Sequence, residues 1–387
     1  MKEKFVKSTI ILIIGGLITK ILGMLIRIAT TRIIGVYGIG LYMMIMPVYT
    51  LFITIATLSL PIAISKLVSE NKRDNKNIVL GIIPIALIIN VFIILFIMLS
   101  SNFIATSLLH NNKLYAPLLA TSVTLPFITI SNIIRGYFFG KEKMIPHVIS
   151  HLCEQIVRLI LIILITPGLL KYGIITAISS LVLFNIISEI LSTVILILFL
   201  PKNVKIEKKD IRINLENIKD IFLISVPTTA SRIILSIGNF LEPVIITLVM
   251  LKIGYNTKYI TYQYGIISGF VFPMVMMPQF LSGAVSSALL PTISKYEADG
   301  NYFMIKKKLK QAVLFSLTIG IIFTIILTIF PYESLKLIFN NTKGVNYLII
   351  AAPIFLLTYV QGPIISTLQA MNKAKVLWNL QNRAPCK

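Results

Sequence analysis

Ten long apolar stretches determine what this chain can fold into. A helix that crosses a bilayer needs about 20 mostly apolar residues, because the hydrocarbon core is about 30 Å thick. The stretches lie at residues 8–34, 39–64, 78–100, 116–139, 148–169, 173–200, 221–251, 262–290, 312–330 and 345–368. Backbone polar groups in lipid must be paired within their own segment, which favours helices. We therefore expect an all-α integral membrane protein, a polytopic bundle of about 10 transmembrane helices.

The composition excludes the soluble classes of protein. Of the 387 residues, 56% are hydrophobic and 13% are charged, and the mean hydropathy is +0.90. Soluble domains carry about 25% charged residues. A soluble fold of this length cannot bury so much apolar surface, which excludes soluble enzymes and disordered proteins. Cys153 and Cys386 form no CxxC pair, so no disulfide framework is indicated.

The distribution of Lys and Arg orients the predicted helices. The net charge is +22, and in a membrane protein the expected partners of such a charge are anionic lipid headgroups, with no nucleic acid. The N-terminus, the even-numbered loops and the C-terminus carry 25 of the 36 basic residues, the opposite side carries seven, and four lie inside spans. Basic loops stay in the cytoplasm. Both termini are therefore predicted to lie on the cytoplasmic side of the cell membrane.

A polar, charged segment at residues 201–220 predicts a cytoplasmic linker between two lobes. The N-lobe, residues 1–200, would hold six helices, and the C-lobe, residues 221–387, four. Residues 60–66 and 290–295 both begin with Leu-Pro and end in Ile-Ser-Lys, which suggests an internal repeat typical of transporters. Chance similarity between apolar segments is the alternative.

The predicted C-lobe has two helices fewer than the predicted N-lobe. The chain ends in a polar stretch, residues 378–387, that does not resemble a closing helix. We expect a truncated C-lobe; a natural ten-span protein is the alternative.

Three cations inside predicted spans are candidates for substrate binding. Ionisable groups in the hydrocarbon are costly and by default functional. Lys20 and Arg27 are seven residues apart, which places both on one helix face. Arg232 lies at a comparable depth in the seventh span. Together they predict a cationic cavity suited to phosphate, which Arg binds bidentately. The alternative is that Arg27 extends outward to the interface and Lys20 pairs with a carboxylate.

The carboxylates inside spans have separate expected roles. Glu154 and Arg158 are spaced i, i+4 and are predicted to form a structural ion pair. Glu189 can partner a buried cation. Glu242 either counters Arg232 or serves as an ion-coupling carboxylate, and the sequence leaves both open.

Metal or cofactor chemistry has little support in the sequence. His147, His151 and Glu154 have a spacing that can hold a metal. They lie at an expected membrane interface, where solvated histidines are common. We expect no metal, no cofactor, no catalytic residue and a protein that is not an enzyme.

Several runs resemble a known family. Residues 19–27, 31–35, 38–44 and 60–66 resemble the N-terminal signature of the stage V sporulation protein B family. Residues 227–232 and 240–243 resemble its seventh helix, and residues 264–265, 273 and 290–295 its eighth. This family belongs to the superfamily of multidrug, oligosaccharidyl-lipid and polysaccharide exporters and is similar to lipid II flippases.

The resemblance implies a function and a set of site residues. It implies movement of an undecaprenyl-pyrophosphate-linked saccharide across the membrane, with a role in the spore cortex. Lys20, Arg27 and Arg232 look like the cavity cations of the related flippases, although Lys20 stands where an Arg is common. It also implies a lipid-linked oligosaccharide as substrate, and cell-wall synthesis proteins as partners.

Two alternative functions remain at this stage. One is a cation-coupled exporter of drugs or other small molecules with the same fold. Exporters of cationic drugs favour carboxylates in the N-lobe cleft, whereas the first span here has two cations and no carboxylate. The other is a non-transporting membrane scaffold for cell-wall synthesis.

Overall fold

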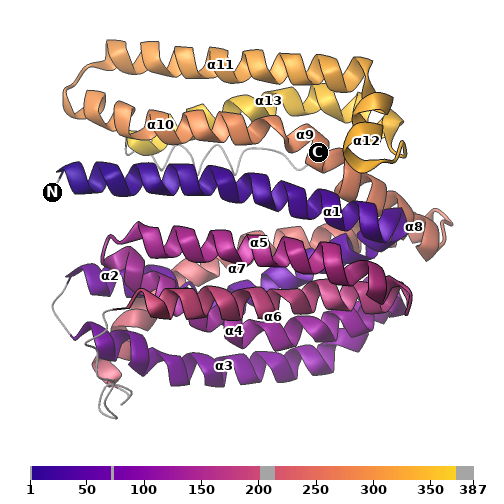
Figure 1. Cartoon of the computed structure of the whole chain (residues 1–387), viewed down its shortest axis with the longest axis horizontal. Coiled ribbons are helices and arrows are strands. Elements are labelled where there is room, and N and C mark those ends of the chain that lie inside the picture. The colour runs from indigo at the N-terminus through magenta and orange to yellow at the C-terminus, as the bar shows by residue number, and fades with distance from the viewer. Residues whose placement is uncertain (1, 71–73, 201–213, 372–387) are drawn as a thin grey trace. The chain divides into compact units, whose positions relative to one another are not determined.

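The structure is a computed structural model that describes residues 2–70, 74–200 and 214–371 (Figure 1). Every regular element in these ranges is a helix. This confirms the all-α membrane fold. Most of the predicted linker and the polar C-terminal stretch lie outside the described residues. By packing, the chain divides into two compact units, residues 1–265 and 266–387, here called unit 1 and unit 2.

The described residues of unit 1 form eight α-helices and two short connecting turns of other helix types. The elements are α1 Lys2–Thr57, α2 Leu60–Glu70, α3 Asn75–Phe103, η1 Ile104–Leu108, η2 Asn112–Leu114, α4 Tyr115–Gly140, α5 Met144–Leu170, α6 Ile174–Leu198, α7 Leu215–Lys252 and α8 Thr257–Gly265. Asp74 and Asn214 cap α3 and α7 by accepting bonds from backbone N–H groups two residues further on. The sequence therefore encodes these helix starts locally.

Helix α1 folds back on itself at Gly35. An uninterrupted helix of 56 residues would be about 84 Å long, far more than a bilayer is thick. Gly35 has φ 70° and ψ −177°, a conformation open almost only to glycine. Arg27 Nη2 lies 3.7 Å from Met43 Sδ, although 16 residues of straight helix would separate them by about 24 Å. The contact requires two arms, as the first two predicted spans suggested.

The observed spans agree with the predicted number. Eight helical elements in the described ranges are long and apolar enough to cross a membrane, and a pair bent by 45° around Met277 makes a ninth if it is counted as one span. Counting α1 as two arms gives about ten crossings. One detail differs from the sequence prediction: the second span breaks at Leu58 and Ser59, which have positive φ, and α2 follows.

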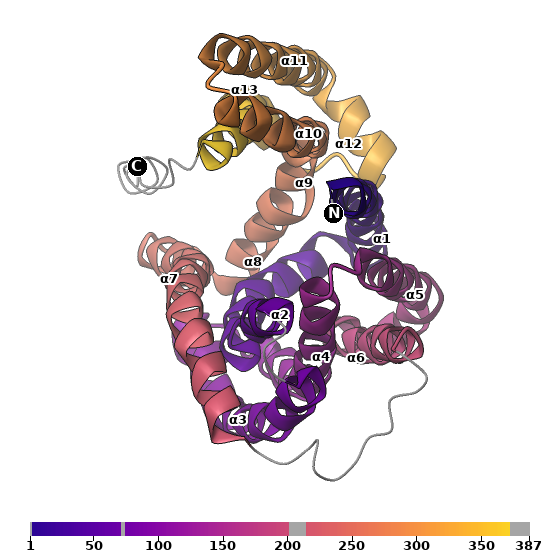
Figure 2. The ribbon, with the colours of Figure 1, turned by 90° about the vertical axis from the view of Figure 1, so that its left-hand side faces the viewer.

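Helix α4 occupies the centre of unit 1. Figure 2, which looks along the helices, shows it enclosed by α2, α3, α5 and α6, and it contacts all four. Two of its glycines permit close approach to the segment that follows the α1 break. A Cβ on Gly136 would lie 2.9 Å from Pro61 Cα, and one on Gly140 2.7 Å from the Ser65 carbonyl oxygen. A polar residue on α4 is therefore shielded from lipid on most sides.

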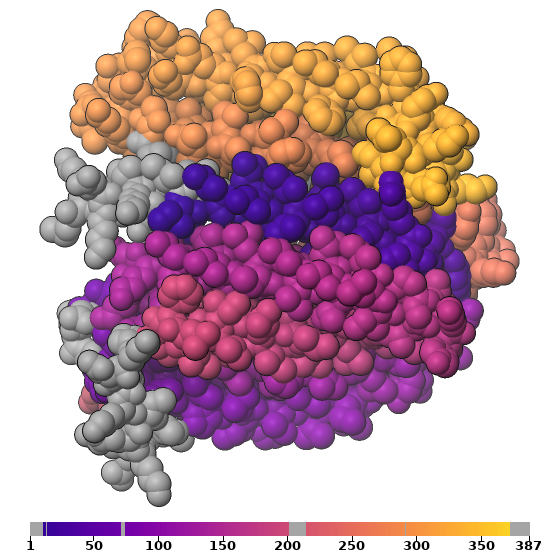
Figure 3. Space-filling model, viewed as in Figure 1, coloured from indigo at the N-terminus to yellow at the C-terminus, as the bar shows by residue number. Residues whose placement is uncertain are grey.

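The two arms of α1 pack on different neighbours. The first arm lies along α5, as the space-filling view also shows (Figure 3), with Gly15 against Val148. The second arm enters the main core of unit 1, where Leu41, Met44 and Ile45 are fully buried. It also meets α8 at Gly40 and Gly265, whose backbones leave no space for a side chain.

The described part of unit 2, residues 266–371, contains six helical elements. They are η3 Ile266–Val271, α9 Phe272–Met276, α10 Pro278–Ala298, α11 Tyr302–Ile329, α12 Pro331–Phe339 and α13 Val345–Ala370. Tyr359 of α13 is fully buried, and its hydroxyl donates to the Val275 carbonyl at 2.6 Å. Ser282 bonds to Ser316 at 3.1 Å and links α10 to α11.

The proposed lobe boundary and the observed packing follow different criteria. The sequence places the start of the C-lobe at residue 221, whereas packing groups α7 and α8 with residues 1–265. The repeated Leu-Pro also occurs in different settings: Leu60 begins α2 after a break, while residues 290–291 lie inside continuous α10. The lobe boundaries therefore remain a prediction from the repeat.

Candidate functional site

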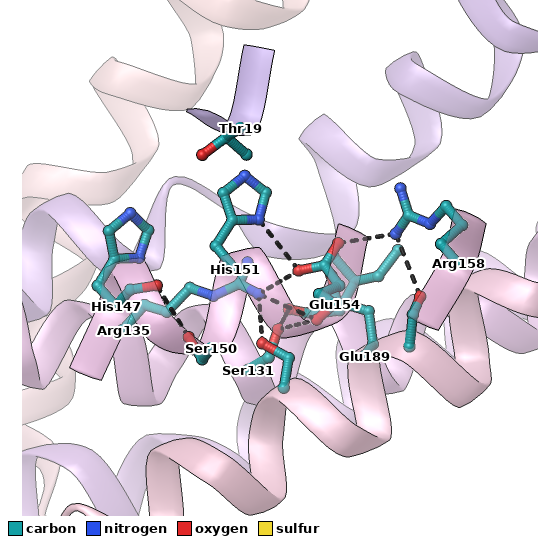
Figure 4. A network of polar contacts seen from close by, with 12 residues as sticks. Thr19, Ser131, Arg135, His147, Ser150, His151, Glu154, Arg158 and Glu189 are labelled. Atoms are coloured by element: carbon teal, nitrogen blue, oxygen red, sulfur yellow. Dashed lines mark hydrogen bonds and ion pairs between the residues drawn. The ribbon is translucent and has the colours of Figure 1, made fainter. Parts of the chain in front are cut away.

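A charged cluster is buried between α4, α5 and α6. Its members are Arg135, Glu154, Arg158 and Glu189, here called the ion cluster (Figure 4). Arg135 Nη2 lies 2.7 Å from Glu154 Oε2 and 3.4 Å from Glu189 Oε2. Arg158 Nη2 lies 2.7 Å from Glu154 Oε1, so the pair expected from the i, i+4 spacing is brought together. Two cations meet two carboxylates, and the cluster is formally neutral.

Hydroxyl groups add hydrogen bonds to the ion cluster, while Arg135 Nε and Arg158 Nε are buried without a hydrogen-bond partner among the described residues. Ser131 donates to Glu189 at 2.6 Å, and Arg135 donates to Ser192 at 2.8 Å. His151 Nδ1 lies 3.2 Å from Glu154 Oε2 at the edge of the cluster. A buried ion pair offsets its desolvation only when its remaining groups are hydrogen-bonded. The charge balance and the serine contacts together indicate a group that holds three helices in register.

Arg135 corrects one step of the sequence interpretation. From the sequence alone, Arg135 counts among the basic residues of the cytoplasmic loops. That assignment is wrong, because Arg135 lies inside α4 with a side chain only 10% exposed. Without it the cytoplasmic side has 24 basic residues against seven, so the predicted orientation is unchanged. The signal was present: Arg135 falls within the apolar stretch 116–139.

Lys20 and Arg27 lie on the first arm of α1. Lys20 is exposed and Arg27 is half-buried, with Met43 beside its guanidinium. Gly16 and Gly23 share their helix face, and a Cβ added to either glycine would meet nothing within 4 Å. Lys20 lies about 22 Å before the Gly35 turn and Arg27 about 12 Å before it. This face, called the α1 polar face, combines two cations with open space inside a predicted span.

Arg232 and Glu242 lie on α7, and both are exposed. Asn239 is exposed between them, and all three fall within about a quarter turn of the helix. Arg232 and Glu242 are ten residues apart, or about 15 Å along the axis, and within the described ranges they form no ion pair with each other. The structure thus separates these two residues and presents them along one stripe.

The exposed charges constrain what the two helices face. A charged side chain at mid-depth is costly in lipid and belongs at a bundle interior or a water-filled cavity. Lys20 and Arg232 are exposed on the surface of unit 1, so water, and not hydrocarbon, is their expected environment. Within the described ranges, neither Lys20 nor Arg232 forms an ion pair with a carboxylate. An anionic ligand can therefore approach both helices.

The described residues hold no group of three potential metal ligands in a metal-binding arrangement. The rings of His147 and His151 stack with centroids 6.0 Å apart, and His151 faces Glu154. These histidines border the ion cluster, which sequence spacing alone does not reveal.

Comparison with known proteins gives the family. A family model described as polysaccharide biosynthesis protein matches residues 5–297, which is about three quarters of the chain. The chain belongs to this family. Its relatives include stage V sporulation protein B of Bacillus subtilis (strain 168), which is 34% identical over 384 residues, covering 96% of this chain and 74% of the relative. The resemblance seen in the sequence is thereby confirmed.

Other members of the wider superfamily are also similar. The lipid II flippase MurJ of Bacillus subtilis (strain 168) is 25% identical over 406 residues, covering 97% of this chain and 74% of MurJ. An inward-facing multidrug resistance MATE family transporter of the MOP superfamily superposes with a TM-score of 0.69 at 15% identity, covering 92% of this chain and 82% of the transporter. This polysaccharide biosynthesis family protein is thus a multi-pass membrane protein with the two-lobe MATE-like fold.

Proposed function

We propose that the chain is a flippase that moves an undecaprenyl-pyrophosphate-linked saccharide, such as lipid II, across the cytoplasmic membrane. The α1 polar face carries this proposal. Lys20 and Arg27 alternate there with Gly16 and Gly23, so the cations stand beside space that a diphosphate can enter. Arginine and lysine are the side chains that bind phosphate. In this proposal Arg232 supplies a third cation from α7.

The relatives support the class of substrate. One is named as a lipid II flippase and another as a stage V sporulation protein, which favours a role in peptidoglycan and spore cortex synthesis. The basic-residue count predicts that both termini lie in the cytoplasm. Glu242 is proposed as a counter-charge or ion-coupling group, and Glu154 with Arg158 as a structural pair.

A drug exporter is the second candidate, because the structural neighbours include multidrug transporters. The charge of α1 argues against it. Residues 4–69 contain no Asp or Glu, so beyond Glu3 at its start the first arm offers cationic drugs no carboxylate. A non-transporting scaffold is the third candidate, and it predicts no translocation at all.

Lipid II translocation in liposomes tests the flippase. Arg27→Ala and Arg232→Ala should each weaken substrate binding by about ten- to a hundredfold, since a charged hydrogen bond contributes about 1.5–3 kcal/mol. Translocation should fall accordingly, with normal membrane insertion. Lys307→Ala, a change at an exposed position near the start of α11, is the matched control. Full translocation by both arginine variants would remove these residues from the site, and absence of translocation by the parent chain would favour the scaffold.

A further inference from the structure

Unit 1 has a second cationic feature, at the end that the basic-residue count predicts to be outside. A cavity of about 390 Å³ is lined by Tyr37, residues 110–113, Thr257 and Lys258. These residues come from the start of the second α1 arm, from the connection between α3 and α4, and from the first turn of α8. Figure 1 shows α8 and the turn of α1 at the same end of the bundle. The volume lies in the range of small-ligand sites.

The cavity wall is held by specific contacts. The Asn111 side chain donates to Thr261 Oγ1 at 3.2 Å and accepts from the Lys113 backbone N–H at 3.1 Å. Its backbone N–H donates to the Ala105 carbonyl at 2.7 Å. Lys113 Nζ lies 5.0 Å from the centre of the Tyr37 ring, which restrains the ammonium group through a cation–π contact. Asn111 therefore fixes the loop to α8 and Tyr37 positions the cation.

The charge of the cavity is one-sided. Lys113, Lys258 and His110 line it, and no carboxylate does. The contributing segments, residues 28–50, 101–118 and 251–265, contain no Asp or Glu. Thr257 opens α8, so the positive end of that helix adds to the lysine charges. Nothing in these segments neutralises the lysines, and the natural complement is an anion.

We propose that this cavity binds a phosphate-bearing group, a phosphodiester or a diphosphate, at the outer end of unit 1. The group is either the headgroup of an anionic lipid or the diphosphate of a lipid-linked saccharide. The site is separate from the α1 polar face, because Arg27 and Lys20 lie about 12 Å and about 22 Å along the helix before the Gly35 turn, and neither lines the cavity. It does not depend on the proposed flippase activity.

Binding of inorganic pyrophosphate to the purified chain in neutral detergent is the first test, measured by calorimetry. The double variant Lys113→Gln/Lys258→Gln should bind at least tenfold more weakly than the parent. The control Lys171→Gln/Lys252→Gln removes the same charge from exposed lysines of the same end that do not line the cavity, and should bind as the parent does. All four positions are exposed, and gel filtration verifies that each variant folds.

A second experiment identifies the source of the phosphate-bearing group. The chain is placed in phosphatidylcholine nanodiscs with or without phosphatidylglycerol, and the gain in thermal stability is measured. Loss of a phosphatidylglycerol effect in the Lys113→Gln/Lys258→Gln variant supports the site and assigns a lipid headgroup. Binding of pyrophosphate without such an effect supports the site and assigns a diphosphate.

Two results would overturn the proposal. If pyrophosphate binding weakened equally in the control double variant, the effect would come from the general positive charge of the surface and not from the cavity. The other result is pyrophosphate binding that is lost in Lys20→Gln/Arg27→Gln/Arg232→Gln and kept in Lys113→Gln/Lys258→Gln. It would show that the anion binds to the cations proposed for flipping and not to the cavity at the outer end. That second result would leave the flippase proposal standing and remove this one.

Discussion

The buried charges of α4, α5 and α6 have a measurable energetic role. Arg135→Met removes one cation from the ion cluster and leaves Glu189 and Glu154 with a surplus negative charge. Breaking one partner of a buried pair costs about 3–5 kcal/mol. We expect a comparable loss in the free energy of unfolding in detergent.

The double variant Arg135→Met/Glu189→Gln restores neutrality and separates charge from packing. Because the two residues interact directly, their effects should not add, and the double variant should be more stable than Arg135→Met alone. A double variant that loses the sum of the two single effects would contradict the assignment of the cluster as a coupled unit.

The backbone turn at Gly35 can be tested at the level of the helix. Its φ and ψ lie in a region that is low in energy almost only for glycine, so Gly35→Ala should lower the free energy of unfolding by about 1–3 kcal/mol. Gly16→Ala is the matched control in the same helix: its Cβ meets nothing, and alanine in a helix interior gains roughly 0.5–1 kcal/mol over glycine. Thermal unfolding of both variants in detergent measures the contrast. Equal stability of the two would show that residue 35 does not need its positive φ.

Most of the helices could be predicted from the sequence, but not every break or buried contact. The apolar stretches predict the helices because the bilayer demands length and continuity, and Gly35 falls between the first two stretches. The break at Leu58 and Ser59 was not readable, since neither residue favours positive φ. The environment of Arg135 was also missed, because burial depends on α5 and α6, which are distant in the sequence.

Topology is the prediction at the scale of the whole molecule. In a variant without Cys153 and Cys386, Tyr172→Cys should react with an impermeant thiol reagent in intact cells, and Lys307→Cys should not. Tyr172 is 81% exposed in the turn between α5 and α6, and Lys307 is exposed near the start of α11. The excess of basic residues on one side is the physical reason. Labelling of Lys307→Cys in cells that have not been permeabilised would contradict the predicted orientation.

The candidate site residues were identified from the sequence, but their shared role was not. The sequence identified Lys20, Arg27, Arg232 and Glu242 from the cost of charge in hydrocarbon, and the structure presents three of them on the surface of unit 1 and Arg27 half-buried. Their shared role stays a prediction, because the cost of charge indicates a function without naming the ligand. The cavity at residues 110–113 was not visible in the sequence, since it depends on three distant connections.

The fold-back of α1 has a consequence for how the protein is made. The two arms meet through residues as close in sequence as Arg27 and Met43, so the loop that brings them together is short and its closure costs little entropy. The hairpin can close once the ribosome has released these first residues, before α5 or α8 has been synthesised. The chain can therefore deliver its first two crossings to the bilayer as one paired unit, with Arg27 already held against Met43.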